Sequence, residues 1–117
     1  MSAIDRERFE ELVGQVLDEL PPWVTERLRN VFVTVEDLPP PGQGNLLGLY
    51  HGVPQADRGN HYSGALPDSI TLYRATLMTV AGHDETRLKH QIARTVAHEI
   101  AHHFGISDDR LLEIDAY

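Results

Sequence analysis

Cysteine is absent from all 117 residues of the chain. A thiolate metal site, a disulfide framework and a cysteine nucleophile are therefore excluded. Basic residues are also scarce, because 10 Lys and Arg stand against 18 Asp and Glu, for a net charge of −8 with histidine neutral. Binding to a nucleic-acid backbone needs clustered Lys and Arg, so we expect no nucleic-acid partner.

Long apolar runs are missing as well. No stretch approaches the roughly 18 residues that a membrane span needs, and residues 1–6 are too charged for the apolar part of a signal peptide. We therefore expect no membrane partner and, by default, a cytoplasmic location. The proportions of hydrophobic (41%) and charged residues (24%) are those of an ordinary globular protein. The length predicts a single domain over residues 1–117.

Histidine is concentrated near the C-terminus, where three of the seven histidines lie within six residues. This stretch contains the pattern His-Glu-x-x-His-x-x-Gly-x-x-Asp, formed by His98, Glu99, His102, Gly105 and Asp108. Two imidazoles four residues apart on a helix lie on one face, so both can bind one metal ion. The glutamate between them can act as a general base. The pattern predicts a metal site of the hydrolytic kind.

A catalytic zinc ion keeps three protein ligands and leaves a fourth position for water. Gly105 can adopt a left-handed conformation without steric cost, so the chain can turn back after the helix. Asp108 is then the expected third ligand, with Asp109 as its rival. In such a site the metal ion lowers the pKa of the bound water toward about 7. Glu99 would take its proton and pass it to the leaving amine, which hydrolyses an amide, most naturally a peptide bond.

The hydrophobic periodicity predicts several helices around this motif. Pro21 and Pro22 end the first helix, and Pro22 can open the second. Asp84 is the expected N-cap of the motif helix, and Gly82 ends the helical turns before it. The expected helices cover residues 5–20, 22–30, 75–81, 85–104 and 107–114.

Three segments rich in β-branched and aromatic residues predict strands, over residues 31–36, 46–51 and 69–74. The first is apolar on nearly both faces, so we expect it to be a central strand that is covered on each side. A stiff Pro/Gly loop over residues 37–45 connects it to the second strand.

At the motif the chain resembles the zincin metallopeptidases, in the variant with Asp as third ligand. The order of elements is similar to that of the small bacterial "mini-zincin" family, whose strands match residues 31–39, 48–50 and 70–74. The resemblance implies an α+β minimal zincin-like domain. This fold has a small three-stranded mixed sheet with N-terminal helices, an active-site helix and a short C-terminal helix.

The same resemblance implies the chemistry of the site. His98, His102 and Asp108 match the ligands of one zinc ion, and Glu99 matches the general base; the spacing of Asp108 fits the family better than that of Asp109. The substrate would be a peptide or protein, paired in extended form with an edge strand beside the site. We expect this edge strand to be residues 70–74.

The absence of a methionine after the motif keeps an alternative to catalysis open. Larger zincins carry a methionine turn after the ligands, whereas Met1 and Met78 both precede the motif here. This favours, as an alternative, a catalytically weak or inactive zincin-like domain that acts as a protein-interaction module. A structural zinc is less favoured, because closed structural sites use four ligands rich in Cys. Such a small domain also leaves apolar surface that a homodimer could cover.

Further residues are assigned by weaker arguments. Tyr117 could return beneath the metal site, or be a frayed terminal residue. Tyr50 or Tyr73 could donate a hydrogen bond to an oxyanion, and His103 has the wrong helical phase for a ligand, which favours a partly buried, hydrogen-bonded side chain. The remaining candidates are two histidines for the cleft, two acids that could orient an imidazole or be solvated, and two solvent-facing histidines: His51, His61, Glu113, Asp115, His83 and His90.

Overall fold

The computed structural model of the protein describes residues 4–52 and 68–105. Within these ranges, helices and strands combine in an α+β fold with a small mixed sheet, which confirms the predicted fold class. The predicted helix over residues 107–114 lies outside the described residues. In the described part of the chain, no helix has the length and apolar character to cross a membrane. The elements are α1 (Arg6–Glu19), α2 (Pro22–Thr25), β1 (Val31–Glu36), β2 (Gly48–His51), β3 (Asp68–Tyr73), α3 (Arg74–Ala81) and α4 (Glu85–His103).

The sheet has the strand order β1-β3-β2, with β3 parallel to β1 and antiparallel to β2. Two predictions are therefore wrong. Residues 31–36 form an edge strand, and Phe32 on it is 63% exposed. Residues 70–74 contribute mainly to the central strand β3, whose two sides are both hydrogen-bonded to neighbours, so β3 has no edge to offer a peptide. The strand that lies at the edge beside α4 is β2.

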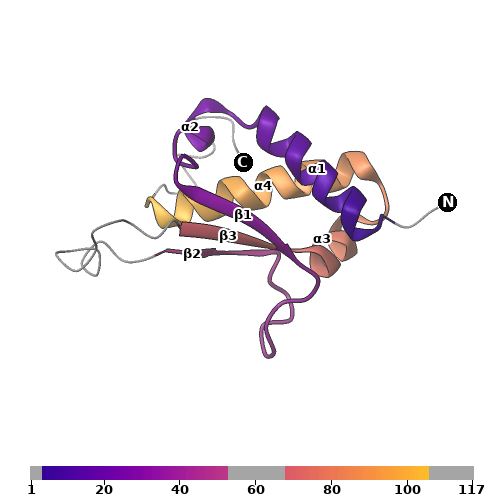
Figure 1. Ribbon diagram of the computed structural model, residues 1–117. Helices are drawn as coiled ribbons and strands as arrows, with labels where there is room; N and C mark the ends of the chain where they lie inside the picture. Colours follow the sequence, from indigo (N-terminus) through magenta and orange to yellow (C-terminus); the bar gives the residue numbers. More distant parts are fainter. Residues whose placement is uncertain (1–3, 53–67, 106–117) are drawn as a thin grey trace.

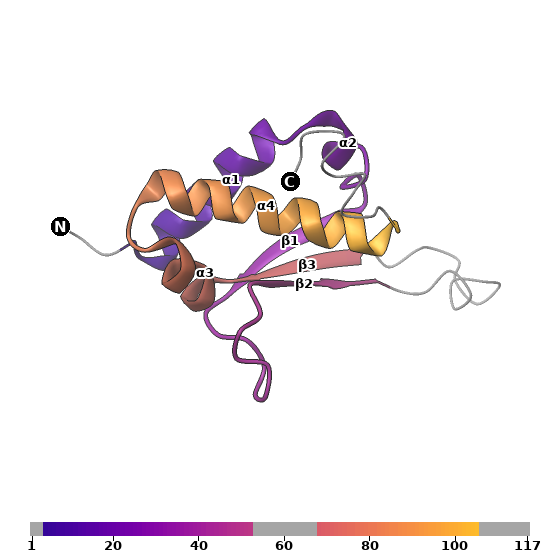
Figure 2. The same cartoon turned by 180° about the vertical axis from the view of Figure 1, so that it is seen from behind.

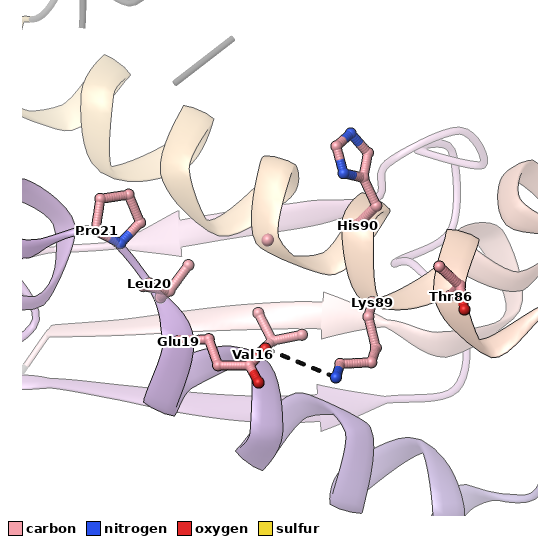
Figure 3. A pocket seen from close by; sticks show the side chains of 8 residues that line it. Val16, Glu19, Leu20, Pro21, Thr86, Lys89 and His90 are labelled. Atoms are coloured by element: carbon pink, nitrogen blue, oxygen red, sulfur yellow. Dashed lines mark ion pairs between the residues drawn. The ribbon is translucent and has the colours of Figure 1, made fainter. Parts of the chain in front are cut away.

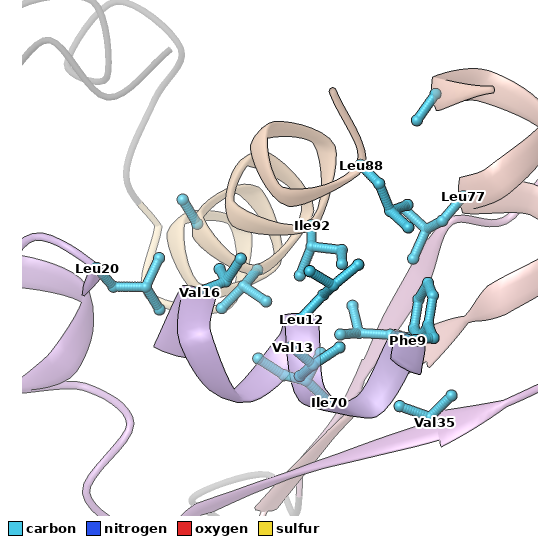
Figure 4. Close-up of a cluster of buried hydrophobic side chains, with 14 of the residues drawn as sticks. Phe9, Leu12, Val13, Val16, Leu20, Val35, Ile70, Leu77, Leu88 and Ile92 are labelled. Atoms are coloured by element: carbon cyan, nitrogen blue, oxygen red, sulfur yellow. The ribbon is translucent and has the colours of Figure 1, made fainter. Parts of the chain in front are cut away.

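Helices α1 and α4 lie on the same face of the sheet, and the loop between β1 and β2 projects away from them (Figures 1 and 2). The hydrophobic core fills the space between these helices and the sheet (Figure 4). Ile70 and Leu72 from β3 are fully buried against it, as are Phe9 and Leu12 from α1. A single apolar layer of this kind holds α4 on the sheet.

The motif helix α4 is fixed by an N-terminal cap and by a stripe of buried apolar side chains. The side chain of Asp84 accepts hydrogen bonds from the backbone N–H groups of Thr86 and Arg87, which satisfies two of the first-turn donors. The apolar residues that repeat every four positions are fully buried, as predicted: Leu88, Ile92, Val96 and Ile100. Because this stripe faces the core, the neighbouring face of α4 is left for the motif residues.

An ion pair joins the N-terminal parts of α1 and α4. Arg8 donates from Nη2 to Glu85 Oε1 at 2.7 Å and from Nε to Glu85 Oε2 at 2.9 Å. This hydrogen bonding lowers the pKa of the Glu85 carboxyl below its ordinary value. A carboxyl with a lower pKa in the folded than in the unfolded state stabilises the fold above its unfolded pKa, and this contribution is lost as pH falls through the folded pKa.

Replacement of the arginine should therefore weaken the acid sensitivity of the fold. We expect the free energy of unfolding to decrease less steeply from about pH 7 to pH 3 in Arg8→Met than in the wild type. Urea unfolding at several pH values measures this slope. Arg87→Met removes the same charge from an exposed position of α4 and should leave that slope unchanged. An equal slope in the Arg8→Met variant and the wild type would contradict this role.

Candidate metal centre

The motif residues His98, Glu99 and His102 lie together near the C-terminal end of α4. The ring centroids of His98 and His102 are 6.0 Å apart in an edge-to-face arrangement. His98 is half-buried with its Nε2 atom buried, whereas His102 is exposed. Just past the helix, Gly105 has a φ of 73°, the left-handed conformation that only glycine adopts easily. Asp108, the predicted third ligand, and Tyr117 lie outside the described residues.

His98, Glu99 and His102 line a groove of about 340 Å³ between α4 and the edge strand β2. Leu47 and Gly48 form the wall on the strand side. A second hollow of about 480 Å³ is lined by Glu99 and His102 together with Tyr50, Gly52 and His103. Glu99 and His102 line both hollows, so the general-base candidate lies where they meet.

Glu99 is held by the edge strand. The backbone N–H of Tyr50 donates a hydrogen bond of 2.9 Å to Glu99 Oε1. The register explains why this donor is available: Tyr73 N–H bonds to Leu47 C=O, so in this antiparallel pair the N–H and C=O groups of Gly48 and Tyr50 point away from β3. Sequence reasoning missed this contact, because the two residues lie 49 positions apart and no local pattern links them.

The side chain of Tyr50 has partners of its own. Its hydroxyl donates to Asp68 Oδ2 at 2.6 Å, and its ring stacks on the ring of His103 with the centroids 3.9 Å apart. The hydroxyl that was predicted as an oxyanion donor thus points to a carboxylate. His103 was expected to be partly buried, but it is exposed and packs on an aromatic ring.

The other predicted residues lie away from these hollows or outside the described residues. Tyr73 is 3% exposed, and this burial, with a smaller effect from the charge of Glu36, raises the pKa of its hydroxyl. Strand alternation puts Tyr73 on the sheet face opposite to Ile70 and Leu72, and thus away from α4. His51 is exposed at the end of β2. His83 and His90 are exposed, as expected, whereas His61, Asp109, Glu113 and Asp115 lie outside the described residues.

Comparison with known proteins shows the family to which the chain belongs. Residues 28–117 match the family model of the zincin-like metallopeptidases. The chain belongs to this family. No curated protein matches it. Among solved structures, the zincin-like fold is similar to a conserved hypothetical protein from Thermo thermophilus, with 31% sequence identity and a TM-score of 0.57 over 86% of this chain and 94% of the other.

Membership of the zincin-like family implies zinc, and the residues present fit that ion in part. Two imidazoles one helical turn apart are ligands of the type that zinc prefers. A catalytic zinc needs a third protein ligand, and the described residues hold no group of three or more His, Asp or Glu side chains close enough to share an ion. The described residues thus bring together two side chains of the kind that zinc prefers, and the predicted third ligand, Asp108, lies outside them.

Among the hollows away from the motif, one lies between the end of α1 and the first half of α4 (Figure 3). Its volume of about 360 Å³ is similar to that of the motif groove. Lys89 Nζ and Glu19 Oε2 face each other across it at 3.7 Å. This hollow pairs one cation with one carboxylate and lacks the motif residues, which line the groove beside β2.

The groove depends on a close approach of α4 to β2 at Gly48. A Cβ at this position would lie 2.8 Å from Thr95 Cγ2 and 3.1 Å from the carbonyl oxygen of Thr71. We therefore expect Gly48→Ala to lower the free energy of unfolding by about 1–3 kcal/mol, the usual cost of overpacking, as measured by urea unfolding. Gly14→Ala is the matched control. No atom lies within 4 Å of a Cβ there, and alanine in a helix should stabilise by about 0.5–1 kcal/mol. A gain at both positions would show that the approach at Gly48 is not tight.

Proposed function

We propose that the protein is a zinc-dependent metallopeptidase that hydrolyses peptide bonds. His98, His102 and Asp108 are the proposed zinc ligands, and Glu99 is the proposed general base. The observation that carries the proposal is the placement of His98, Glu99 and His102 together on the groove beside an edge strand. When bound, zinc would activate a water molecule and polarise the carbonyl group to be attacked.

Glu99 has the position and the chemistry for proton transfer. Its carboxylate lies between the two imidazole residues in sequence and lines the groove with both of them. One carboxylate oxygen is held by Tyr50 N–H, which leaves the other oxygen for a proton. A carboxylate fixed in this way would take a proton from the attacking water and return it to the leaving amine.

The β2 strand offers a way to hold an extended peptide in the groove. Gly48 directs its backbone N–H and C=O groups, and Tyr50 its C=O group, away from β3, while the Tyr50 N–H is bound to Glu99. Strand β2 ends the sheet on this side. An extended peptide can add to such an edge by main-chain hydrogen bonds, with little dependence on its sequence. We therefore assign the role of substrate-pairing strand, first expected for residues 70–74, to β2.

Zinc content and turnover test the proposal together. We expect the purified full-length chain to bind about one zinc per molecule, as measured by elemental analysis after dialysis, and to cleave a denatured mixed-protein substrate. His98→Ala removes one imidazole and should lose both the zinc and the turnover. His90→Ala is the matched control, because it removes an exposed imidazole from the same helix, two turns earlier. Wild-type protein that binds no divalent metal would rule the proposal out.

A further inference from the structure

Tyr50 joins the edge strand to the carboxylate of Glu99, and its side chain makes contacts that the proposed mechanism does not use. Its backbone N–H binds Glu99, its hydroxyl binds Asp68 and its ring stacks on His103. One residue thus contacts the proposed base, the start of the central strand and the end of α4. We propose that Tyr50 is a positioning residue for Glu99, and that Asp68 holds Tyr50 in place. This inference rests on the proposed function, because it takes Glu99 to be the base.

The anchor at Asp68 is well suited to fix a strand. Asp68 is 8% exposed and begins β3, where its backbone N–H also bonds to the carbonyl of Asn30 before β1. The Tyr50 hydroxyl reaches it at 2.6 Å, within the range of short, charge-assisted hydrogen bonds to a carboxylate. Because Tyr50 opposes Ile70 in the register, this bond crosses diagonally to the neighbouring position on the same sheet face.

The packing around the ring leaves it little freedom. His103 stacks on Tyr50 with an angle of 18° between the ring planes. On the chain just after β2, a Cβ on Gly52 would lie 2.7 Å from Tyr50 Cε1, 3.0 Å from His103 Cε1 and 3.4 Å from Asp68 Cγ. The absence of a side chain at Gly52 therefore lets the backbone lie directly against this cluster. A ring held on several sides fixes the backbone to which it is attached.

The consequence for Glu99 is geometric. An edge strand is tied to its sheet on one side only, so its outward N–H groups move with any twist of the strand. The contacts at Asp68 and His103 restrain that twist at the residue whose N–H meets Glu99 Oε1. The carboxylate is thus oriented by an ordered donor, which is the support that a precisely placed catalytic group needs.

Hydrogen exchange of the Tyr50 amide tests this coupling in the full-length, metal-free protein. We expect Glu99→Ala to speed exchange of this amide roughly fivefold, the factor that corresponds to about 1 kcal/mol for one net hydrogen bond. Asp68→Ala should speed it by a similar factor, because the strand is released from the carboxylate. In the double variant the two effects should not multiply, since each breaks the same bond.

Two further variants separate positioning from general stability. Asp68→Asn keeps an oxygen acceptor for the hydroxyl and should restore exchange close to the wild-type rate. Thr34→Val removes a hydroxyl that lies 3.3 Å from the hydroxyl of Thr71 between β1 and β3, and its effect should multiply with that of Glu99→Ala. Effects of Asp68→Ala and Glu99→Ala that multiply in the double variant would overturn the proposal, as would unchanged exchange in Asp68→Ala.

Turnover gives the second measurement. With a denatured mixed-protein substrate, Tyr50→Phe should lower kcat with little change in KM, because an oriented base acts in the transition state more than in binding. A rise in KM alone would overturn the positioning role. Hydrogen exchange needs neither metal nor substrate, so it tests the coupling of Tyr50 to Glu99 separately from the proposed function. If the protein shows no turnover, but the effects of Asp68→Ala and Glu99→Ala on exchange do not multiply, the proposed function is disproved and the coupling is retained.

Discussion

Glu99→Gln is expected to lower peptide turnover by about 10²- to 10⁴-fold, the usual contribution of a general base. The amide has nearly the shape of the carboxylate, and its oxygen can still accept the hydrogen bond from Tyr50 N–H that Glu99 accepts at 2.9 Å. The variant should therefore keep the groove and the bound zinc while losing proton transfer. The measurement is kcat with a denatured mixed-protein substrate, together with the zinc content of the same sample.

A control for charge accompanies this variant. Glu7→Gln removes one negative charge from an exposed position of α1, on a different helix from the motif, and should leave turnover unchanged. Wild-type turnover in Glu99→Gln would show that another group takes the proton. A wild-type chain that binds zinc without turnover would instead favour a non-catalytic interaction domain.

The motif helix could be predicted from sequence because its determinants are local. Asp84 caps the helix within its first turn, and the spacing of Leu88, Ile92 and Val96 puts them on one helical face over a stretch longer than an ordinary strand. The placement of His98 and His102 on the neighbouring face follows from that repeat. Helical periodicity therefore predicted both the element and the side on which the motif lies.

The strand order could not be predicted in the same way. The first strand, β1, is rich in valine, and an apolar pattern does not distinguish a central strand from an edge strand with one open face. Phe32 belongs to that open face, with 63% exposure. The order β1-β3-β2 depends on pairings between distant segments, and with it the choice of the strand that can receive a peptide.

The contacts around Glu99 were missed for a related reason. Gly48 lets α4 approach the edge strand closely, and two residues later the Tyr50 N–H meets the carboxylate, a contact for which Tyr50 itself carries no sequence signal. A glycine in a strand does indicate a close approach of another backbone or a bulge. Gly48 was the one cue in the sequence that could have pointed to this contact.

Ile100→Ala is expected to lower the free energy of unfolding by about 2–5 kcal/mol. Ile100 is fully buried and lies between Glu99 and His102 in the sequence, so it anchors the part of α4 that carries the motif. Truncation removes buried methyl groups and leaves a cavity in the core beneath the site. Since a whole domain is stable by only about 5–15 kcal/mol, this is a large fraction of the total. Urea unfolding in a metal chelator measures it, and Ile100→Val should cost only about 0.5–1.5 kcal/mol.

Zinc that binds the folded state should restore part of the free energy of unfolding that Ile100→Ala loses. A ligand at a hundred times its dissociation constant stabilises the fold by about 2.7 kcal/mol, and the gain does not depend on how stable the fold was before. Ile100→Ala and the wild type should therefore gain equally from zinc, whereas Ile100→Ala combined with His98→Ala should gain nothing. A smaller gain in Ile100→Ala than in the wild type would mean that the cavity distorts the ligand geometry. The packing of α4 would then control the metal site as well as the stability of the fold.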